Sequence, residues 1–278
     1  MKRLNKEDRV VIGMGCRWNI LMLITITSVE LLGWALSAQA AEKRTILAME
    51  YPPYESSTLP SDGLAGEILD NIFAQMGIED TFEYQPLKRA INNIVTGENH
   101  LFVGNLSFFT EQERENLILL PFVNIRMVFF YDTTRYVNAI DFETLEQLKD
   151  YRIGILLGGF EKDILMSHQL TVYENPNYEG LFRMLNADRI DLCASLDISG
   201  LDMIRRIFPG DEQKFGIVAK PLASIPAGLI MSKNLPGYQS FMVKFQQSFA
   251  TIKANGTYLS ILEKYYGKGN VPKDAMVE

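Results

Sequence analysis

Strand-like and helix-like segments alternate from residue 45 to residue 266, and this alternation is the feature that most limits the fold of the chain. Short apolar runs typical of strands are followed by segments whose apolar residues have helical spacing. Repeated units of this kind predict parallel or mixed sheets with helices on both faces. The pattern restarts after Tyr131, where residues 133–138 are expected to form a crossing linker to a second lobe.

The expected elements follow from these periodicities and from the glycines and polar residues that bound them. Strands are expected at 45–49, 81–84, 101–103, 126–131, 152–157, 172–173, 190–194, 215–219 and 227–231. Helices are expected at 67–76, 88–96, from Thr110 onward, and at 142–150, 161–167, 178–185, 201–208, 239–252 and 258–266.

Residues 1–40 have the pattern of a secretory signal peptide, which predicts export to the periplasm. A basic start and a largely apolar run lead to Ala-Gln-Ala at 38–40, so Ala41 is expected to begin the mature chain. A membrane anchor is the alternative, because the apolar run approaches spanning length. Glu30 interrupts that run and favours cleavage, and the sequence leaves open whether translation starts at Met1 or Met14.

Charge and cysteine content exclude several classes of function. Removing the five basic and three acidic residues of 1–40 from totals of 27 and 34 leaves 22 and 31, a net charge of −9. This balance argues against nucleic acid and anionic membranes as partners. Cys193 is then the single cysteine and is expected to be a small buried residue. With His100 and His168 as the two histidines, no zinc site, Ser–His–Asp triad or other cofactor site is expected.

The stretch GNLSFFTEQER at 104–114 predicts a site for a small carboxylate. Asn105 and Ser107 offer polar groups after an apolar strand, and Thr110 with Glu113 has the spacing of a capping box. Arg114 then falls in the first turn of a helix, where free backbone N–H groups and a guanidinium favour an anion. The alternative for Arg114 is an exposed side chain that pairs with neighbouring glutamates.

Other candidate residues follow the ends of predicted strands, where open α/β sheets bind ligands. Tyr51 and Tyr54 flank two prolines and are expected either to form an aromatic wall or to pack as part of a surface turn. Asp197 is expected either to meet a ligand ammonium group or to cap the helix near Ser199. Asp191 is expected to serve a turn or a sheet end.

Three further candidates carry weaker signals. Arg89 lies at a strand–helix junction, where it either reaches the cleft or belongs to a solvated basic face. Gly158 and Gly159 permit a ligand to approach the backbone closely, although they lack the spacing of a dinucleotide or P-loop fingerprint.

Several motifs give residues 45–267 a resemblance to the periplasmic solute-binding proteins of the amino-acid-binding group, bacterial extracellular solute-binding protein family 3. They are YPPY at 51–54, PLKRA at 86–90, the stretch from Ser107 to Arg114, LKDYRIGILLGG at 148–159, RID at 189–191 and FATIKANGTYLSILEKYYG at 249–267. The last is the most specific. The resemblance implies an α/β, two-lobed type II periplasmic-binding-protein fold, each lobe a mixed sheet flanked by helices. Lobe one would comprise residues 44–131 plus 226–278, and lobe two residues 132–225.

The resemblance also implies roles for individual residues. Arg114 matches the arginine that grips the ligand's α-carboxylate, Ser107 the neighbouring hydroxyl, and Tyr51 an aromatic wall of the pocket. Gly158 and Gly159 match the second-lobe loop that donates backbone N–H groups. Asp197 matches the acid that takes the ammonium group. Ser107 and Arg114 are one residue further apart here than in typical members.

These implications lead to an expected function. The protein would be a monomeric, non-enzymatic binding protein that captures an amino acid or related organic acid and delivers it to an ABC permease. Two alternatives stay open: a ligand-sensing protein of the same fold, and an enzyme resembling the cyclohexadienyl dehydratases.

Overall fold

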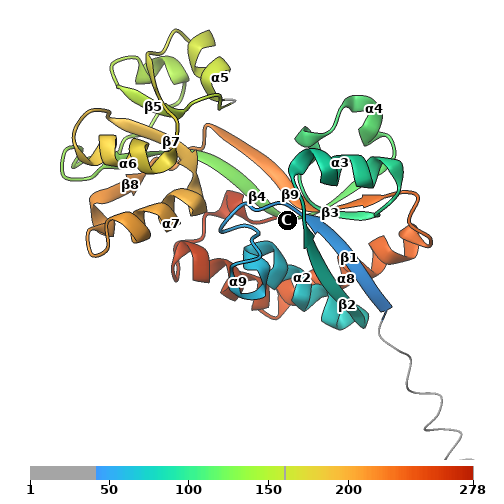
Figure 1. Ribbon diagram of the computed structural model, residues 1–278. Coiled ribbons are helices and arrows are strands. Elements are labelled where there is room, and N and C mark those ends of the chain that lie inside the picture. The colour runs from blue at the N-terminus through green and yellow to red at the C-terminus, as the bar shows by residue number, and fades with distance from the viewer. Residues whose placement is uncertain (1–41, 160, 278) are drawn as a thin grey trace, which may run out of the picture. The chain divides into compact units, whose positions relative to one another are not determined.

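The computed structural model describes residues 42–159 and 161–277, and its longest strand, β4 (Leu117–Asp132), lies within a nine-stranded sheet of that part (Figure 1). The predicted signal peptide lies outside the described residues. The strand order is β2 (Ile78–Tyr84), β1 (Glu42–Ala48), β3 (Leu101–Gly104), β9 (Ala223–Ser232), β4, β7 (Leu192–Leu196), β5 (Ile153–Leu156) and β6 (Val172–Asn175), with β8 (Phe215–Ile217) paired to β4.

Strand β4 joins the two halves of the sheet because its partner changes along its length. Leu117 to Met127 pair with β9, whereas Met127 to Phe130 pair with β7 and Phe130 to Asp132 pair with β8, all antiparallel. Parallel pairs lie on either side, since β1 pairs with β3 and β5 pairs with β6 and β7. Both halves are therefore mixed, and the chain crosses between them through β4 and β9.

The sequence of β4 explains why it lies inside the molecule. From Arg126 to Asp132 every residue is buried. A largely apolar run of this kind is typical of a strand that is covered on both faces. Alternate side chains enter different cores: Met127 and Phe129 pack in the main core, and Val128 and Phe130 pack with Phe182 and Cys193 in a second core. Cys193 is a free, buried cysteine, as predicted.

Helices cover both halves of the sheet. In the first half, α2 (Gly63–Met76), α8 (Tyr238–Ala254) and α9 (Thr257–Tyr266) pack on one another, and α3 (Leu87–Thr96) contacts β3 (Figure 1). In the second half, α6 (Tyr178–Asn186) and α7 (Asp197–Ile207) contact β7 and each other, and α5 (Glu161–Ser167) contacts β6. The remaining α-helix of the described chain is the four-residue α4 (Glu111–Arg114). None of the helices in residues 42–159 and 161–277 is long and apolar enough to span a bilayer.

The predicted helix at 142–150 is wrong. The segment forms a short 3₁₀ turn, η3 (Leu145–Leu148), which a capping box between Thr144 and Gln147 begins. Phe142, Leu145 and Leu148 are three residues apart; Phe142 and Leu148 belong to the main core, and the half-buried Leu145 packs against it. Side chains at this spacing eclipse one another in a 3₁₀ helix, so the pattern suits one short turn packed on the core.

Several strands are longer than predicted, β4 and β9 most of all. Strand β4 begins at Leu117 and β9 at Ala223, before the expected starts at residues 126 and 227. Pro226 lies inside β9 opposite Asn124, a position at which a proline argues against a strand. The predicted lobe limits at residues 131/132 and 225/226 stay a prediction, because contacts group the chain from Lys43 onward as one unit.

Candidate functional site

A cavity of about 620 Å³ lies where the turn after β1 and the end of β3 meet the middle of β4 and β9. Its floor consists of three cross-strand pairs, Val123 with Ala227, Ile125 with Ile225 and Met127 with Ala223. The other lining residues are Met49, Tyr51, Tyr54, Glu55, Leu64, Ala65, Leu87, Val103, Gly104, Asn105, Ser107, Phe108, Phe122, Leu196 and Gly228. The volume suits a small organic molecule, and the lining is predominantly apolar.

The turn from Tyr51 to Glu55 forms one wall of this cavity. Its two ends are closed by backbone hydrogen bonds, from Tyr51 N–H to the Glu55 carbonyl at 2.7 Å and from Glu55 N–H to the Tyr51 carbonyl at 3.2 Å. The Tyr51 and Tyr54 rings stack with centroids 5.8 Å apart. Burial, with nearby Glu55 and Glu161, raises the pKa of Tyr51 to about 12, so its hydroxyl is neutral at physiological pH. The structure thus brings both predicted tyrosines to the cavity.

Glu55 belongs to the same wall and was not among the predicted residues. Its side chain is 4% exposed, and burial raises the pKa of its carboxyl group well above the usual value. A carboxyl group immediately after a rigid Tyr-Pro-Pro-Tyr turn is the sequence signal that points to it, because a turn that positions two rings positions the next residue too.

Asn105 and Ser107 also line the cavity, directly after the end of β3. Asn105 caps the 3₁₀ turn η2 (Leu106–Phe108), and its side-chain oxygen accepts hydrogen bonds from the Ser107 N–H at 2.9 Å and from the Ser107 hydroxyl. The two residues therefore satisfy each other at the strand end and still border the cavity.

Asp197 lies at the start of α7 and is completely buried, away from the cavity lining. One carboxylate oxygen accepts hydrogen bonds from the Tyr54 hydroxyl at 3.1 Å and the Ile198 N–H at 2.7 Å. The other accepts from the Tyr266 hydroxyl at 2.7 Å and from Arg126 Nη1 at 3.2 Å. Each oxygen already has two donors, so the protein itself supplies the partners that the resemblance reserves for a ligand ammonium group.

Arg126 is the buried cation that the sequence analysis missed. It is 3% exposed, and it also donates to Asp274 at 2.8 Å and to the Ala219 carbonyl at 2.9 Å. The available signal was a single arginine inside the apolar run VNIRMVFFY, since a charged side chain in a buried strand needs a charged or polar partner.

The structure does not bring Arg114 into the cavity. The predicted capping box is confirmed: the Glu113 carboxylate accepts the Thr110 N–H at 2.8 Å, and the Thr110 hydroxyl oxygen accepts the Glu113 N–H at 3.4 Å. The glutamate thus occupies the helix start that was expected to hold a ligand anion. Arg114 is the last residue of α4 and is exposed, and Arg89, on α3, is also exposed and outside the lining.

Gly158 and Gly159 also lie outside the cavity lining. Gly158 adopts a φ of +78°, which favours glycine. The Gly159 N–H donates to the Leu156 carbonyl at 2.9 Å, and the Glu161 carboxylate packs so closely on Gly159 that an added Cβ would lie 2.4 Å from its oxygens. The Leu156 N–H donates to that carboxylate at 3.3 Å. In this structure the Glu161 side chain therefore contacts the loop backbone that was expected to bind a ligand.

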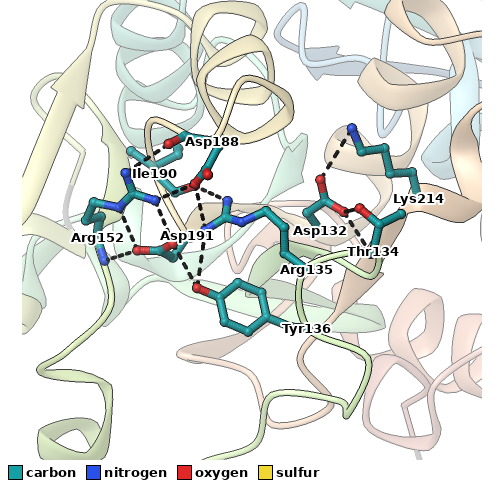
Figure 2. Close-up of polar contacts among 9 residues, drawn as sticks. All are labelled: Asp132, Thr134, Arg135, Tyr136, Arg152, Asp188, Ile190, Asp191 and Lys214. Carbon is teal, nitrogen blue, oxygen red and sulfur yellow. Dashed lines mark hydrogen bonds and ion pairs between the residues drawn. The ribbon is translucent and has the colours of Figure 1, made fainter.

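Asp191 serves the end of β7 through a charged cluster, as predicted (Figure 2). One of its oxygens accepts from the Arg152 backbone N–H and from Arg152 Nε, both at 2.8 Å. The other accepts from the Tyr136 hydroxyl at 2.8 Å and from Arg135. Figure 2 also shows Asp132 bound by Thr134 and Lys214. These contacts fix the second half of the sheet.

Comparison with known proteins identifies the fold. Neither a protein-family model nor a curated protein matches the chain by sequence. The chain is similar to the L-cystine solute receptor of Neisseria gonorrhoeae in its unliganded open conformation, with a TM-score of 0.67 and 15% identity over 86% of this chain and 96% of that one.

Two further solved structures agree with this result. Substrate-binding domain 2 of Lactococcus lactis GlnP has a TM-score of 0.61 and 17% identity over 81% of this chain and 96% of its own. A histidine kinase sensor domain with similarity to periplasmic binding proteins has a TM-score of 0.55 and 17% identity over 82% and 98%. The protein therefore has the two-lobed α/β fold of type II periplasmic binding proteins, which confirms the predicted fold class.

Proposed function

We propose that the protein is an exported solute-binding protein that captures a small molecule in the cavity between the Tyr51–Glu55 turn, the end of β3 and the crossing strands. The observation that carries the proposal is the cavity itself, about 620 Å³ in volume and bordered by strand ends. The gonococcal relative is described as an L-cystine receptor, which supports a small-molecule ligand here.

Lobe closure would complete the site. The proposed lobes, residues 44–131 plus 226–278 and residues 132–225, are linked by β4 and β9, so bending of these strands would move one lobe over the ligand. Closure would expel water and strengthen the polar contacts of the ligand. The closed form would then dock on an ABC permease in the periplasm, with the protein acting as a monomer and without enzymatic chemistry.

The proposal does not include the carboxylate ligand that the sequence predicted through Arg114. That arginine is exposed at the end of α4, and none of the cavity-lining residues within 42–159 and 161–277 is Lys, Arg or His. A carboxylate in the cavity would therefore depend on neutral donors such as the Tyr51 hydroxyl and the Asn105 amide, because the Tyr54 and Ser107 hydroxyls already donate to Asp197 and Asn105.

A thermal-shift screen of the mature chain from Ala41 against amino acids, amines and small organic acids tests the proposal. Ala223→Trp fills the cavity floor from a half-buried position, and Val243→Trp adds the same ring to an exposed position on α8. Stabilising compounds should lose their effect on the Ala223→Trp variant and keep it on the Val243→Trp variant. Equal binding to both variants would place the ligand outside this cavity.

A sensory role is the second candidate, and the similarity to a histidine kinase sensor domain favours it. Both roles need the same ligand site and differ in the partner. Co-purification of the ligand-loaded protein with a permease supports transport, and co-purification with a receptor kinase supports sensing. An assay with prephenate or arogenate tests the enzymatic alternative.

A further inference from the structure

Glu55 stands out among the residues that line the cavity because it is a buried acid without a partner. The described residues contain no hydrogen-bond or ion-pair partner for its carboxyl group, although the side chain is 4% exposed. The carboxyl oxygens of Glu55 are also not among the fully enclosed polar atoms without a partner, so they keep some accessible surface. Because Glu55 is one of the lining residues, the cavity is the space from which a ligand would reach its carboxyl group.

The surroundings of Glu55 contain rings and apolar side chains rather than cations. The Tyr51 and Tyr54 rings lie on the same turn, and Ala223, Ile225 and Met127 form the floor. Of the lining side chains in the described part of the chain, Glu55 is the only acid and none is basic, whereas the buried Arg126 is paired with Asp197 and Asp274. A buried carboxylate without a positive partner is costly, so a ligand that supplies the partner gains binding energy there.

We infer that Glu55 binds the positively charged group of an amine whose remaining part is aromatic or aliphatic. The inference rests on the proposed function and names its ligand class. The ammonium group would donate to the Glu55 carboxylate and could also meet the faces of the Tyr51 and Tyr54 rings, while the apolar part would cover the β4–β9 floor. An anionic ligand of the same shape would face the acid with no cation to offset it.

A matched pair of probes tests the inference on the full mature chain. 2-Phenylethylamine and 3-phenylpropanoate have similar size and opposite charge, and isothermal titration calorimetry measures the affinity of each. The amine should bind more tightly by about tenfold or more, as expected for one charge-assisted contact in a buried site. Glu55→Gln should remove that preference, and Arg114→Ala, a change at an exposed position outside the cavity, should leave it intact.

A pH series provides a second test, with the Glu55→Gln variant as its control. Burial raises the pKa of the Glu55 carboxyl group, and it also raises the pKa of Tyr51 to about 12 and the pKa values of Tyr54 and Tyr84. The tyrosine hydroxyls are therefore neutral at physiological pH, and Glu161, which lies near Tyr51, is a further acid whose pKa burial raises. Affinity for the amine should rise with pH, and binding should release a proton.

The outcomes separate the inference from the proposed function. The inference is overturned if the protein prefers 3-phenylpropanoate. It is also overturned if the Glu55→Gln variant binds the amine as tightly as the parent and the affinity does not depend on pH. If the carboxylate binds and Ala223→Trp abolishes its binding, the cavity remains a solute site and only the ligand class is wrong. If no compound in the screen or in this pair binds, both the inference and the proposed function fail.

Discussion

Arg126 on β4 and Asp197 at the start of α7 form a buried ion pair, with 3.2 Å between Arg126 Nη1 and the carboxylate oxygen. The two residues are 71 positions apart in the sequence, and the pair ties the crossing strand to the second half of the sheet. Two tyrosines complete the contacts, Tyr54 from the cavity wall and Tyr266 from α9. Asp197, which the resemblance pairs with a ligand ammonium group, is thus paired with groups of the protein itself in this structure.

Breaking this pair from one side should cost much more stability than removing both charges. Arg126→Met leaves Asp197 buried without its cation, and we expect a loss of about 4 kcal/mol in the free energy of unfolding. The double change Arg126→Met with Asp197→Leu should cost less than the sum of the single changes. Urea unfolding followed by circular dichroism measures all three variants. Strictly additive losses would show that the two side chains do not interact.

The tyrosine hydroxyls on Asp197 should each contribute measurable stability. Tyr54→Phe and Tyr266→Phe remove a hydrogen bond to a buried carboxylate, so each should cost about 2 kcal/mol. Tyr51→Phe is the matched control, because Tyr51 stacks on Tyr54 and its hydroxyl has no hydrogen-bond partner within the described residues. A cost for Tyr51→Phe equal to that of Tyr266→Phe would contradict the assignment.

Lowering the pH should destabilise the second half of the sheet, because the Asp191 carboxylate becomes protonated. Burial alone would raise the pKa of this carboxyl, but hydrogen bonds from Arg152, Tyr136 and Arg135 outweigh burial and hold the pKa well below its usual range. The folded-state pKa is lower than the unfolded value of about 3.9, so the stabilisation is present at neutral pH and is lost as the pH falls below about 4.

The Asp191→Asn variant tests whether the negative charge of Asp191 stabilises the fold at neutral pH. The variant should be less stable than the parent by about 2 kcal/mol at pH 7, and the difference should shrink progressively below pH 4. Chemical unfolding at a series of pH values gives both curves. A difference that stays constant down to pH 2 would mean that the Asp191 charge does not stabilise the fold.

Arg114→Ala should leave ligand affinity within about twofold of the parent value, because the side chain is exposed and lies outside the cavity lining. Calorimetry with the tightest-binding compound from the thermal-shift screen provides the measurement. A loss of about tenfold or more would restore the arginine–carboxylate site that the sequence motif suggests.

Local patterns predicted much of the fold because they act over a few residues. The Thr110–Glu113 capping box and the alternation of strands and helices depend on near neighbours, and the structure confirms both apart from the predicted helix at 142–150. The site depends on distant contacts instead. Arg126 and Asp197 lie on separate elements, and Glu113, within the same short helix, occupies the helix start on which the Arg114 prediction relied.

A crystal structure of the mature protein with the tightest-binding compound would show directly where the ligand binds. The ligand should lie against Tyr51, Glu55 and Ala223, above the floor formed by β4 and β9. A ligand bound at Arg114 and α4, with this cavity empty, would contradict this prediction.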